Sequence, residues 1–207
     1  MPGKRLKQDF YAQETLRVAP ALLGKRLVRL WQGKRLAGRI VEVEAYTGRE
    51  DQSSHARCGP TARNAPMFGP PGRTYIYLIY GMYHCLNLVT EDVGFPAAVL
   101  IRALEPLEGI ETQSQLRPTH ALNDLARGPG RLCQALGIDR QLNALDVCTA
   151  NSPLWVEEDL TLPPEAIATG PRIGVRGDAA ALQVPWRFVI AKSPWVSRGK
   201  STLARNS

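Results

Sequence analysis

Two glutamates stand in an apolar stretch that alternates like a β-strand. Residues 40–46 read Ile-Val-Glu-Val-Glu-Ala-Tyr. A period of two therefore places Glu42 and Glu44 on one face together with Ile40 and Tyr46. A carboxylate beside an aromatic ring at the rim of a cleft can act as a general base. An edge strand with an acidic face in water would give the same pattern, so the spacing alone leaves both interpretations open.

Tyrosines are concentrated in the next apolar stretch, where four of the six in the chain fall within nine residues. The alternation predicts a strand with Tyr75 and Tyr77 on one face. A tight turn should follow, with Tyr80, Met82 and Tyr83 exposed at its tip. Apolar wedges of this kind are pushed between base steps by many proteins that open a duplex. A tyrosine-rich strand packed in the core is the alternative interpretation.

One arginine interrupts a third stretch, the otherwise apolar residues 97–104. A guanidinium on such a strand is expected to be partly buried, and Arg102 then needs a carboxylate or another acceptor. Glu42 and Glu44 are the natural candidates for this partner. The first and third stretches should therefore lie together, although a purely structural ion pair would satisfy the same requirement.

Periodicity and turn residues predict the elements that must position these side chains. Helices are expected at 14–23 and 131–136, the second with a Gly128-Pro129-Gly130 entry and a Gly137 exit. Strands are expected at 26–30, 39–46, 74–80, 83–89, 97–104, 172–175 and 186–190.

Two segments lack such periodicity. Residues 47–72, which contain His55, are polar and rich in glycine and proline, and a loop of this length is usually functional or disordered. Residues 151–166 are acidic and should form a surface loop that faces away from any DNA. Many short strands, few helices and no βαβ rhythm predict an α+β fold, in which a mainly antiparallel curved sheet and short flanking helices form a single compact domain.

Length and charge limit the class of protein. The 207 residues suit one domain, and no apolar run approaches the roughly 20 residues that span a bilayer, so no membrane partner is expected. The net charge is +7, with +8 in residues 1–40, +4 in 192–207 and −5 between them. This distribution suits nucleic acid as partner, although a solubilising excess of charge would look the same. Residues 1–12 and 199–207 are expected to be flexible basic ends.

Metal and cofactor motifs are not found in the sequence. The four cysteines form no Cys-x-x-Cys pair, and the three histidines have no ligand spacing. We therefore expect no metal, no cofactor and reduced thiols, as in a cytosolic or nuclear protein. A different class of enzyme stays open, because Glu42, Glu44 and Asp51 could supply oxygen ligands for Mg²⁺ in a metal-dependent nuclease.

Several long strings of residues resemble the alkyladenine (3-methyladenine) DNA glycosylase family. The strings are 41–46, 50–55, 63–64, 77–87, 100–107, 132–136 and 193–197. Together they extend over nearly the whole chain. The resemblance implies a single-domain mixed α/β glycosylase without a helix-hairpin-helix. It also implies a monomer that acts on double-stranded DNA, in the cytoplasm and nucleoid of a bacterium or the nucleus of a eukaryote.

The resemblance also implies the reaction. Alkylated and deaminated purines (3-methyladenine, 7-methylguanine, hypoxanthine and ethenoadenine) would be flipped out and released by hydrolysis, without strand cleavage. Glu44 is similar to the general base of the family and Arg102 to the arginine that helps to hold the attacking water, with a main-chain carbonyl near Ile173. A non-catalytic damaged-DNA-binding module, in which Glu44 only pairs with Arg102, is the remaining alternative.

Further residues match the base pocket of the family. Tyr46, His55 and Tyr77 are similar to the aromatic cage that sandwiches the flipped base. Asn87 resembles the residue that crowds the exocyclic amine of normal guanine. It could instead only hydrogen-bond to the strand backbone.

The turn matches the DNA-opening element of the family. Tyr80 corresponds to the side chain that fills the gap in the base stack, with Met82 and Tyr83 beside it in the minor groove. The Gly128-Pro129-Gly130 entry departs from the family pattern, which leaves a phosphate contact by its amides open.

Overall fold

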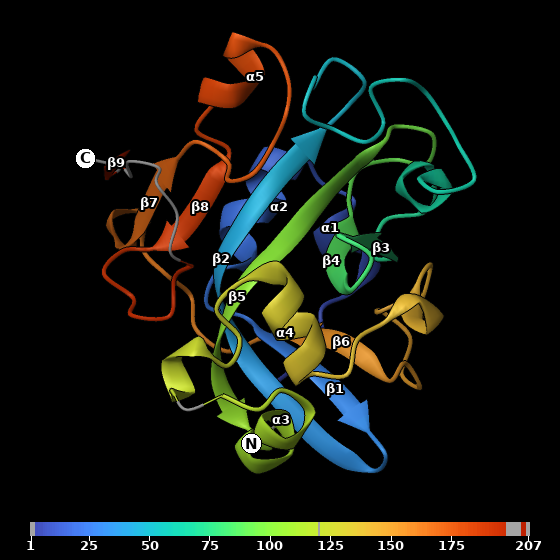
Figure 1. The fold of residues 1–207 in the computed structure, drawn as a ribbon. Coiled ribbons are helices and arrows are strands. Elements are labelled where there is room, and N and C mark those ends of the chain that lie inside the picture. The colour runs from blue at the N-terminus through green and yellow to red at the C-terminus, as the bar shows by residue number, and fades with distance from the viewer. Residues whose placement is uncertain (1–2, 120, 198–203, 206–207) are drawn as a thin grey trace.

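An antiparallel sheet organises the chain (Figure 1). The computed structural model describes residues 3–119, 121–197 and 204–205. Within these ranges the strands are β1 (Arg26–Trp31), β2 (Lys34–Thr47), β3 (Thr74–Ile79), β4 (Tyr83–Val89), β5 (Ala97–Glu108), β6 (Leu154–Glu157), β7 (Ile167–Gly170), β8 (Arg187–Ile190) and β9 (Ala204–Arg205). They follow the order β3-β4-β5-β2-β8-β7-β9, and β1 pairs with both β2 and β6.

Short helices flank this sheet. The α-helices are α1 (Gln8–Tyr11), α2 (Thr15–Leu22), α3 (Ile110–Leu116), α4 (Pro129–Ala135) and α5 (Ala179–Gln183). The 3₁₀ turns are η1 (Ala65–Phe68), η2 (Leu122–Asp124), η3 (Arg140–Leu142) and η4 (Pro164–Ala166). In the described ranges no helix combines the length and apolarity needed to cross a bilayer. The expected α+β class with an antiparallel sheet is confirmed.

Strand β2 is the central strand of the molecule. On one side it pairs with β5 along residues 37–47. On the other side it pairs first with β1, through residues 34–39, and then with β8, through residues 42–44. The sheet therefore divides along β2, and the second half of this strand lies between β5 and β8 (Figure 1).

An irregularity in β2 changes which residues share a face. The register against β5 shifts between Ile40 and Glu42 and again between Glu42 and Val43. Ile40 consequently belongs to the apolar core with Val43 and Ala45 rather than to the face of the glutamates. The expectation that Ile40 shares their face is wrong, because a strict period of two does not survive a β-bulge.

Most of the expected elements are present. Helix α2 matches 14–23, with Pro20 in its last turn, and α4 matches the helix with the glycine-rich entry. Strands β1, β3, β4, β5 and β8 match their expected positions within a few residues, although β2 and β5 are longer than expected. Residues 48–72 contain only the short 3₁₀ turn η1.

Two expectations for the C-terminal third are wrong. Residues 172–175 form no strand, and the strand of this region is β7, directly before them. The backbone amide of Ile173 is satisfied by a side chain, that of Glu44, rather than by a neighbouring strand. Residues 151–166 are not only a surface loop, because β6 lies within them and pairs with β1.

The N-terminal residues pack against the domain. Tyr11 in α1 is fully buried and Leu6 is nearly so, and both belong to the main apolar core. Residues 3–12 therefore do not have the character of a loose basic end. The expected basic end at 199–207 lies outside the described residues except for β9.

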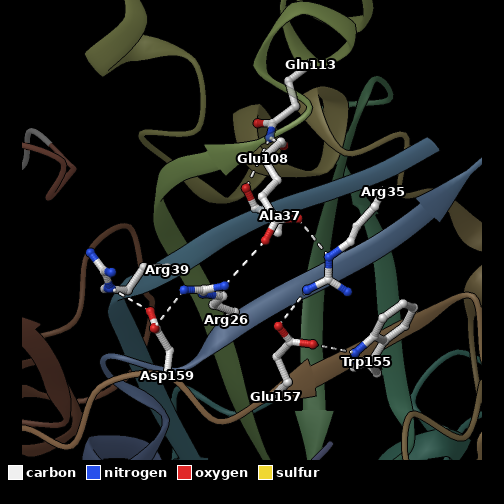
Figure 2. A network of polar contacts seen from close by, with 9 residues as sticks. All are labelled: Arg26, Arg35, Ala37, Arg39, Glu108, Gln113, Trp155, Glu157 and Asp159. Carbon is white, nitrogen blue, oxygen red and sulfur yellow. Dashed lines mark hydrogen bonds and ion pairs between the residues drawn. The ribbon is translucent and has the colours of Figure 1, made fainter. Parts of the chain in front are cut away.

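Arginines of the β1–β2 hairpin are paired with acidic side chains (Figure 2). Arg35 donates to Glu157 at 2.6 Å and to Glu108 at 2.8 Å. Asp159 accepts from Arg26 at 2.9 Å and from Arg39 at 3.0 Å. Acidic side chains of β5, of β6 and of the segment after β6 thus compensate Arg26, Arg35 and Arg39, so these three arginines do not form a free DNA-binding surface.

A glycine that ends α4 gives a test of core packing. Gly137 has φ +59°, and a Cβ added there would lie 2.6 Å from the ring of Trp31. Gly33, in the turn between β1 and β2, has φ +77° and open space around it. Gly33→Ala should cost about 1 kcal/mol of unfolding free energy through its backbone conformation alone. Gly137→Ala should cost about 1–3 kcal/mol more because its methyl group clashes. Urea unfolding of the two variants measures this difference, and equal losses would contradict the packing argument.

Candidate active site

Two carboxylates are buried on the central strand. Glu42 and Glu44 each have no exposed surface, and they alternate with the core residues Val43 and Ala45. Their burial follows from the position of β2 between β5 and β8. The interpretation as an edge strand with a wet acidic face is therefore wrong.

Arginines from two neighbouring strands compensate these carboxylates. Arg102 of β5 contacts Glu42 through Nε at 3.1 Å and Glu44 through Nη1 at 3.2 Å. Arg187 of β8 donates to Glu42 at 2.7 Å. The expected partnership of Arg102 with the glutamates is confirmed. Two negative and two positive groups thus share one buried site, which satisfies the pairing that buried charges require.

Electrostatics keep the guanidinium of Arg102 charged. Burial by itself would lower its pKa, but the negative charges of Glu44 and Glu42 outweigh this effect and raise the pKa above its ordinary value. Arg102 is therefore a fixed cation next to Glu44.

The backbone of Ile173 completes the surroundings of Glu44. Its amide donates to Glu44 Oε1 at 2.7 Å, and its carbonyl accepts from Arg102 Nη1 at 3.5 Å. A main-chain carbonyl therefore lies beside the guanidinium that pairs with Glu44, at the residue near which the family resemblance implied one.

An open cavity of about 620 Å³ lies next to this charged centre. Tyr46, His55, Tyr77 and Asn87 all contribute to its walls, so the structure brings the four expected pocket residues together. The rings of His55 and Tyr77 lie edge to face with their centroids 4.5 Å apart. Most of the rest of the wall comes from the loop after β2, from β3 and from residues 174–176.

Tyr46 connects the cavity with the buried carboxylate. Its hydroxyl donates to Glu44 Oε2 at 2.8 Å. Burial raises the pKa of Tyr46 well above its ordinary value, and the charge of Glu44 raises it further. The phenol therefore stays protonated and remains a donor to Glu44.

His55 is a neutral member of the cavity wall at pH 7. Burial lowers its pKa below the ordinary value of 6.5, and the charges of Arg63 and Arg57 lower it further. Nδ1 of His55 lies 2.9 Å from the hydroxyl of Tyr75, which fixes the orientation of the ring.

Asn87 is held by the backbone of its own hairpin. Its Nδ2 donates to the carbonyl of Tyr75 at 3.0 Å, and its side chain is nearly fully buried at the cavity wall. Asn87 therefore makes the backbone hydrogen bond that the sequence analysis gave as an alternative, and it also lies in the cavity wall.

The turn between β3 and β4 projects large side chains into solvent. Tyr80 is 86% exposed and Met82 is 64% exposed, while Tyr83 is half-buried at the start of β4. Tyr80 and Gly81 have φ values of +50° and +70°, so they form a tight turn. A Cβ at Gly130 would lie 2.9 Å from Tyr83, so a glycine allows α4 to pack closely beneath the turn.

Arg172 is a residue of the site that the sequence did not indicate. Its side chain is fully buried, donates to both oxygens of Asp51 at 2.6 and 2.8 Å, and donates to the carbonyl of Ala45 at 2.9 Å. Its guanidinium lies 4.7 Å from the ring of Tyr46 and 5.1 Å from that of Trp186. Arg172 thus contacts the loop after β2 and the ring of Tyr46, and it ties both to the segment that carries Ile173.

Asp51 pairs with a different arginine from Glu42 and Glu44, the other two carboxylates of the hypothetical magnesium site. Glu42 and Glu44 pair with Arg102, whereas Asp51 pairs with Arg172. In the part of the chain that the structure describes, no three His, Cys, Asp or Glu side chains are grouped as metal ligands. The grouping on which the nuclease hypothesis was based is therefore not formed.

Ser197 and Arg187 were also not singled out from the sequence. Ser197 donates to Glu42 through its amide at 2.6 Å and through its hydroxyl at 2.8 Å. Arg187 could have been identified from the sequence, because it is the single charged residue in the otherwise apolar residues 186–190. Arg102 was identified by the same pattern. Ser197 could not have been identified in this way, because a serine in an irregular segment carries no periodicity.

A second hollow of about 580 Å³ opens on Arg102 from another side. Arg127, Arg131 and Ser197 contribute to its lining. Arg131 is paired with Asp124, and Arg127 donates to the carbonyl of Val196 at 2.6 Å. Arg102 thus faces this second hollow, which shares no lining residue with the aromatic cavity.

Comparisons with known proteins show which family this chain belongs to. The model of the family described as "Methylpurine-DNA glycosylase (MPG)" matches residues 9–194, and the chain belongs to this family, so it is a DNA glycosylase of base-excision repair. A protein named "Putative 3-methyladenine DNA glycosylase" from Methanocella arvoryzae is 53% identical over 93% of this chain and 96% of its own length. Proteins with the same name from Anaeromyxobacter dehalogenans and Streptomyces avermitilis are 53% and 47% identical, over 94% and 93% of this chain and 86% and 90% of their own lengths. The resemblance seen in the sequence motifs is confirmed.

The buried pair of Arg172 and Asp51 should be important for stability. Asp51→Ala leaves a fully buried guanidinium without its carboxylate and should cost about 3–5 kcal/mol of unfolding free energy. The matched control is Asp124→Ala, because Asp124 pairs with Arg131 and the two side chains are 34% and 44% exposed. This variant should lose less than about 1 kcal/mol. Thermal and urea unfolding provide both values, and comparable losses would refute the role given to Arg172.

Proposed function

We propose that this chain flips a damaged purine out of duplex DNA and hydrolyses its N-glycosidic bond with water activated by Glu44. The proposed lesions are 3-methyladenine, 7-methylguanine, hypoxanthine and ethenoadenine. The observation that carries the proposal is the hydrogen bond from Tyr46, in the cavity wall, to Glu44. This hydrogen bond joins an aromatic cavity to a buried carboxylate. A base bound in the cavity would therefore place its sugar near Glu44.

Glu44 is the proposed general base, with Arg102 and the carbonyl of Ile173 as partners for the attacking water. The carboxylate accepts a proton from this water and also stabilises the positive charge that develops on the sugar. Because Arg102 stays charged and Glu44 is fixed by the amide of Ile173, the site needs little reorganisation during the reaction.

The proposed base pocket is the cage formed by Tyr46, His55 and Tyr77. The target bond is inaccessible in a stacked duplex, so the nucleotide must be extruded at a cost of a few kcal/mol. Aromatic faces then stack on the purine and attract the positive charge of an alkylated base, at about 0.5–2 kcal/mol per contact. Asn87 is the proposed element that excludes the exocyclic amine of guanine, and its backbone hydrogen bond would hold it in place.

The exposed turn is the proposed wedge. Tyr80 would fill the gap that the flipped base leaves in the stack, with Met82 and Tyr83 beside it in the minor groove. Their exposure in the free protein supports this role, since apolar side chains that open duplexes must be presented to the DNA.

The proposed reaction ends with an abasic site and an intact strand. The described cavity wall contains arginines but no lysine that could attack the sugar as an amine. We further propose that the protein acts as a monomer without a cofactor, on the chromosome in the cytoplasm. The first test is a duplex with one hypoxanthine or ethenoadenine, which should be nicked after alkali and remain uncut without it.

The replacement Glu44→Gln tests the general base. It keeps the shape of the side chain but removes its basicity, so single-turnover excision should fall by about 10²- to 10⁴-fold. Binding to the lesion duplex, measured by anisotropy, should persist. A matched control is Glu105→Gln on β5, whose carboxylate pairs with Arg39 and lies five residues along the strand from Leu100, the register partner of Glu44. Excision by the Glu44 variant at a rate near that of the original protein would refute the assignment.

Charge at the cavity rim is the basis of a second test. Arg57 and Arg176 are exposed and contribute to the cavity wall, whereas Arg35 and Arg39 are held in ion pairs. Replacing the first two by Gln should weaken binding to damaged and undamaged duplexes alike and lower the slope of log K against log salt by about one per lost contact. Replacing the second pair should change this slope little, and an equal change in both would contradict the proposed DNA face.

A further inference from the structure

One wall of the proposed cage carries a positive charge of its own. The guanidinium carbon of Arg63 lies 5.6 Å from the centroid of the Tyr77 ring. The side chain also donates from Nη2 to the carbonyl of Leu78 at 3.2 Å, which ties it to strand β3. Arg63 is exposed and contributes to the cavity wall, so its charge stands at the cavity itself.

The field of Arg63 reaches the neighbouring aromatic residues. Burial lowers the pKa of His55, and the charge of Arg63 lowers it further. Burial raises the pKa of Tyr75 to about 12, against the opposing effect of Arg63. Three aromatic side chains at or beside the cavity therefore feel one cation.

The two cage tyrosines differ in how their arginines are neutralised. Arg172 stacks on Tyr46 but makes two hydrogen bonds to Asp51, so its charge is compensated in place. Across the described ranges, no ion pair joins Arg63 to an acidic side chain. Among the described residues, the charge over Tyr77 therefore has no acidic side chain that pairs with it.

We propose that Arg63 is a specificity-determining residue that weakens the preference of the cage for positively charged purines over neutral ones. The proposal rests on the proposed function, in which Tyr77 contacts the flipped base. A cationic base and the guanidinium would compete for the same ring and repel each other, whereas a neutral purine still stacks without penalty. Lesion choice would then depend more on shape than on charge, and neutral lesions would be released with comparable efficiency.

The test compares a cationic and a neutral lesion in matched duplexes. Single-turnover excision of 7-methylguanine and of hypoxanthine is measured at subsaturating protein for the original chain, Arg63→Met and Arg63→Lys. Removing the charge in Arg63→Met should raise the ratio of 7-methylguanine to hypoxanthine excision by about 3- to 10-fold. Arg63→Lys keeps the positive charge near the ring and should leave the ratio within about 2-fold of the original value.

A matched control separates this effect from general loss of charge. Arg49→Met removes an exposed arginine whose guanidinium lies 5.8 Å from the ring of Phe68, which is not among the cavity-lining residues. Its excision ratio should not change. A ratio that stays constant in Arg63→Met, with both rates lowered equally, would make Arg63 a general DNA contact and overturn the proposal. Failure of the proposed function would be recognised separately, because the original chain would then release neither base.

Discussion

The burial of two carboxylates on one strand is the constraint on which the rest of the structure depends. Glu42 and Glu44 cannot remain charged in the interior without cations and donors around them. Arg102 and Arg187 supply the cations from the strands on either side, and the backbone of Ile173 and Ser197 supplies donors. Segments that are far apart in the sequence are thereby required to meet at a single point of the sheet.

The division of the sheet along β2 makes this arrangement possible. Near the hairpin the strand is covered by β1, and farther along β8 replaces β1, so that Arg187 reaches Glu42. The irregular segment around Ile173 can then lie over Glu44 instead of continuing the sheet. An aromatic cavity next to a centre of mutually paired charges is the outcome, and Tyr46 connects the two through its hydrogen bond to Glu44.

Much of the fold and the site could be predicted from local patterns, and the failures have physical reasons. Alternation and turn residues identified most strands, and the arginine in an apolar run correctly indicated the pairing of Arg102 with the glutamates. The bulge at Glu42 was not predictable, because it depends on the register of β5. Arg172 was missed because its partners lie 121 and 127 residues away in the sequence. The role of the acidic segment was misjudged for the same reason, since its cations belong to β1 and β2.

The ion pairs of the hairpin arginines also affect the orientation in which the molecule would approach DNA (Figure 2). A net charge of +7 spread evenly would attract DNA to every side and produce many encounters in the wrong orientation. Here Arg26, Arg35 and Arg39 of the β1–β2 hairpin are compensated, while Arg57, Arg63 and Arg176 at the mouth of the cavity form no ion pair within the described ranges. These three charges would favour encounters in which the mouth of the cavity faces the duplex.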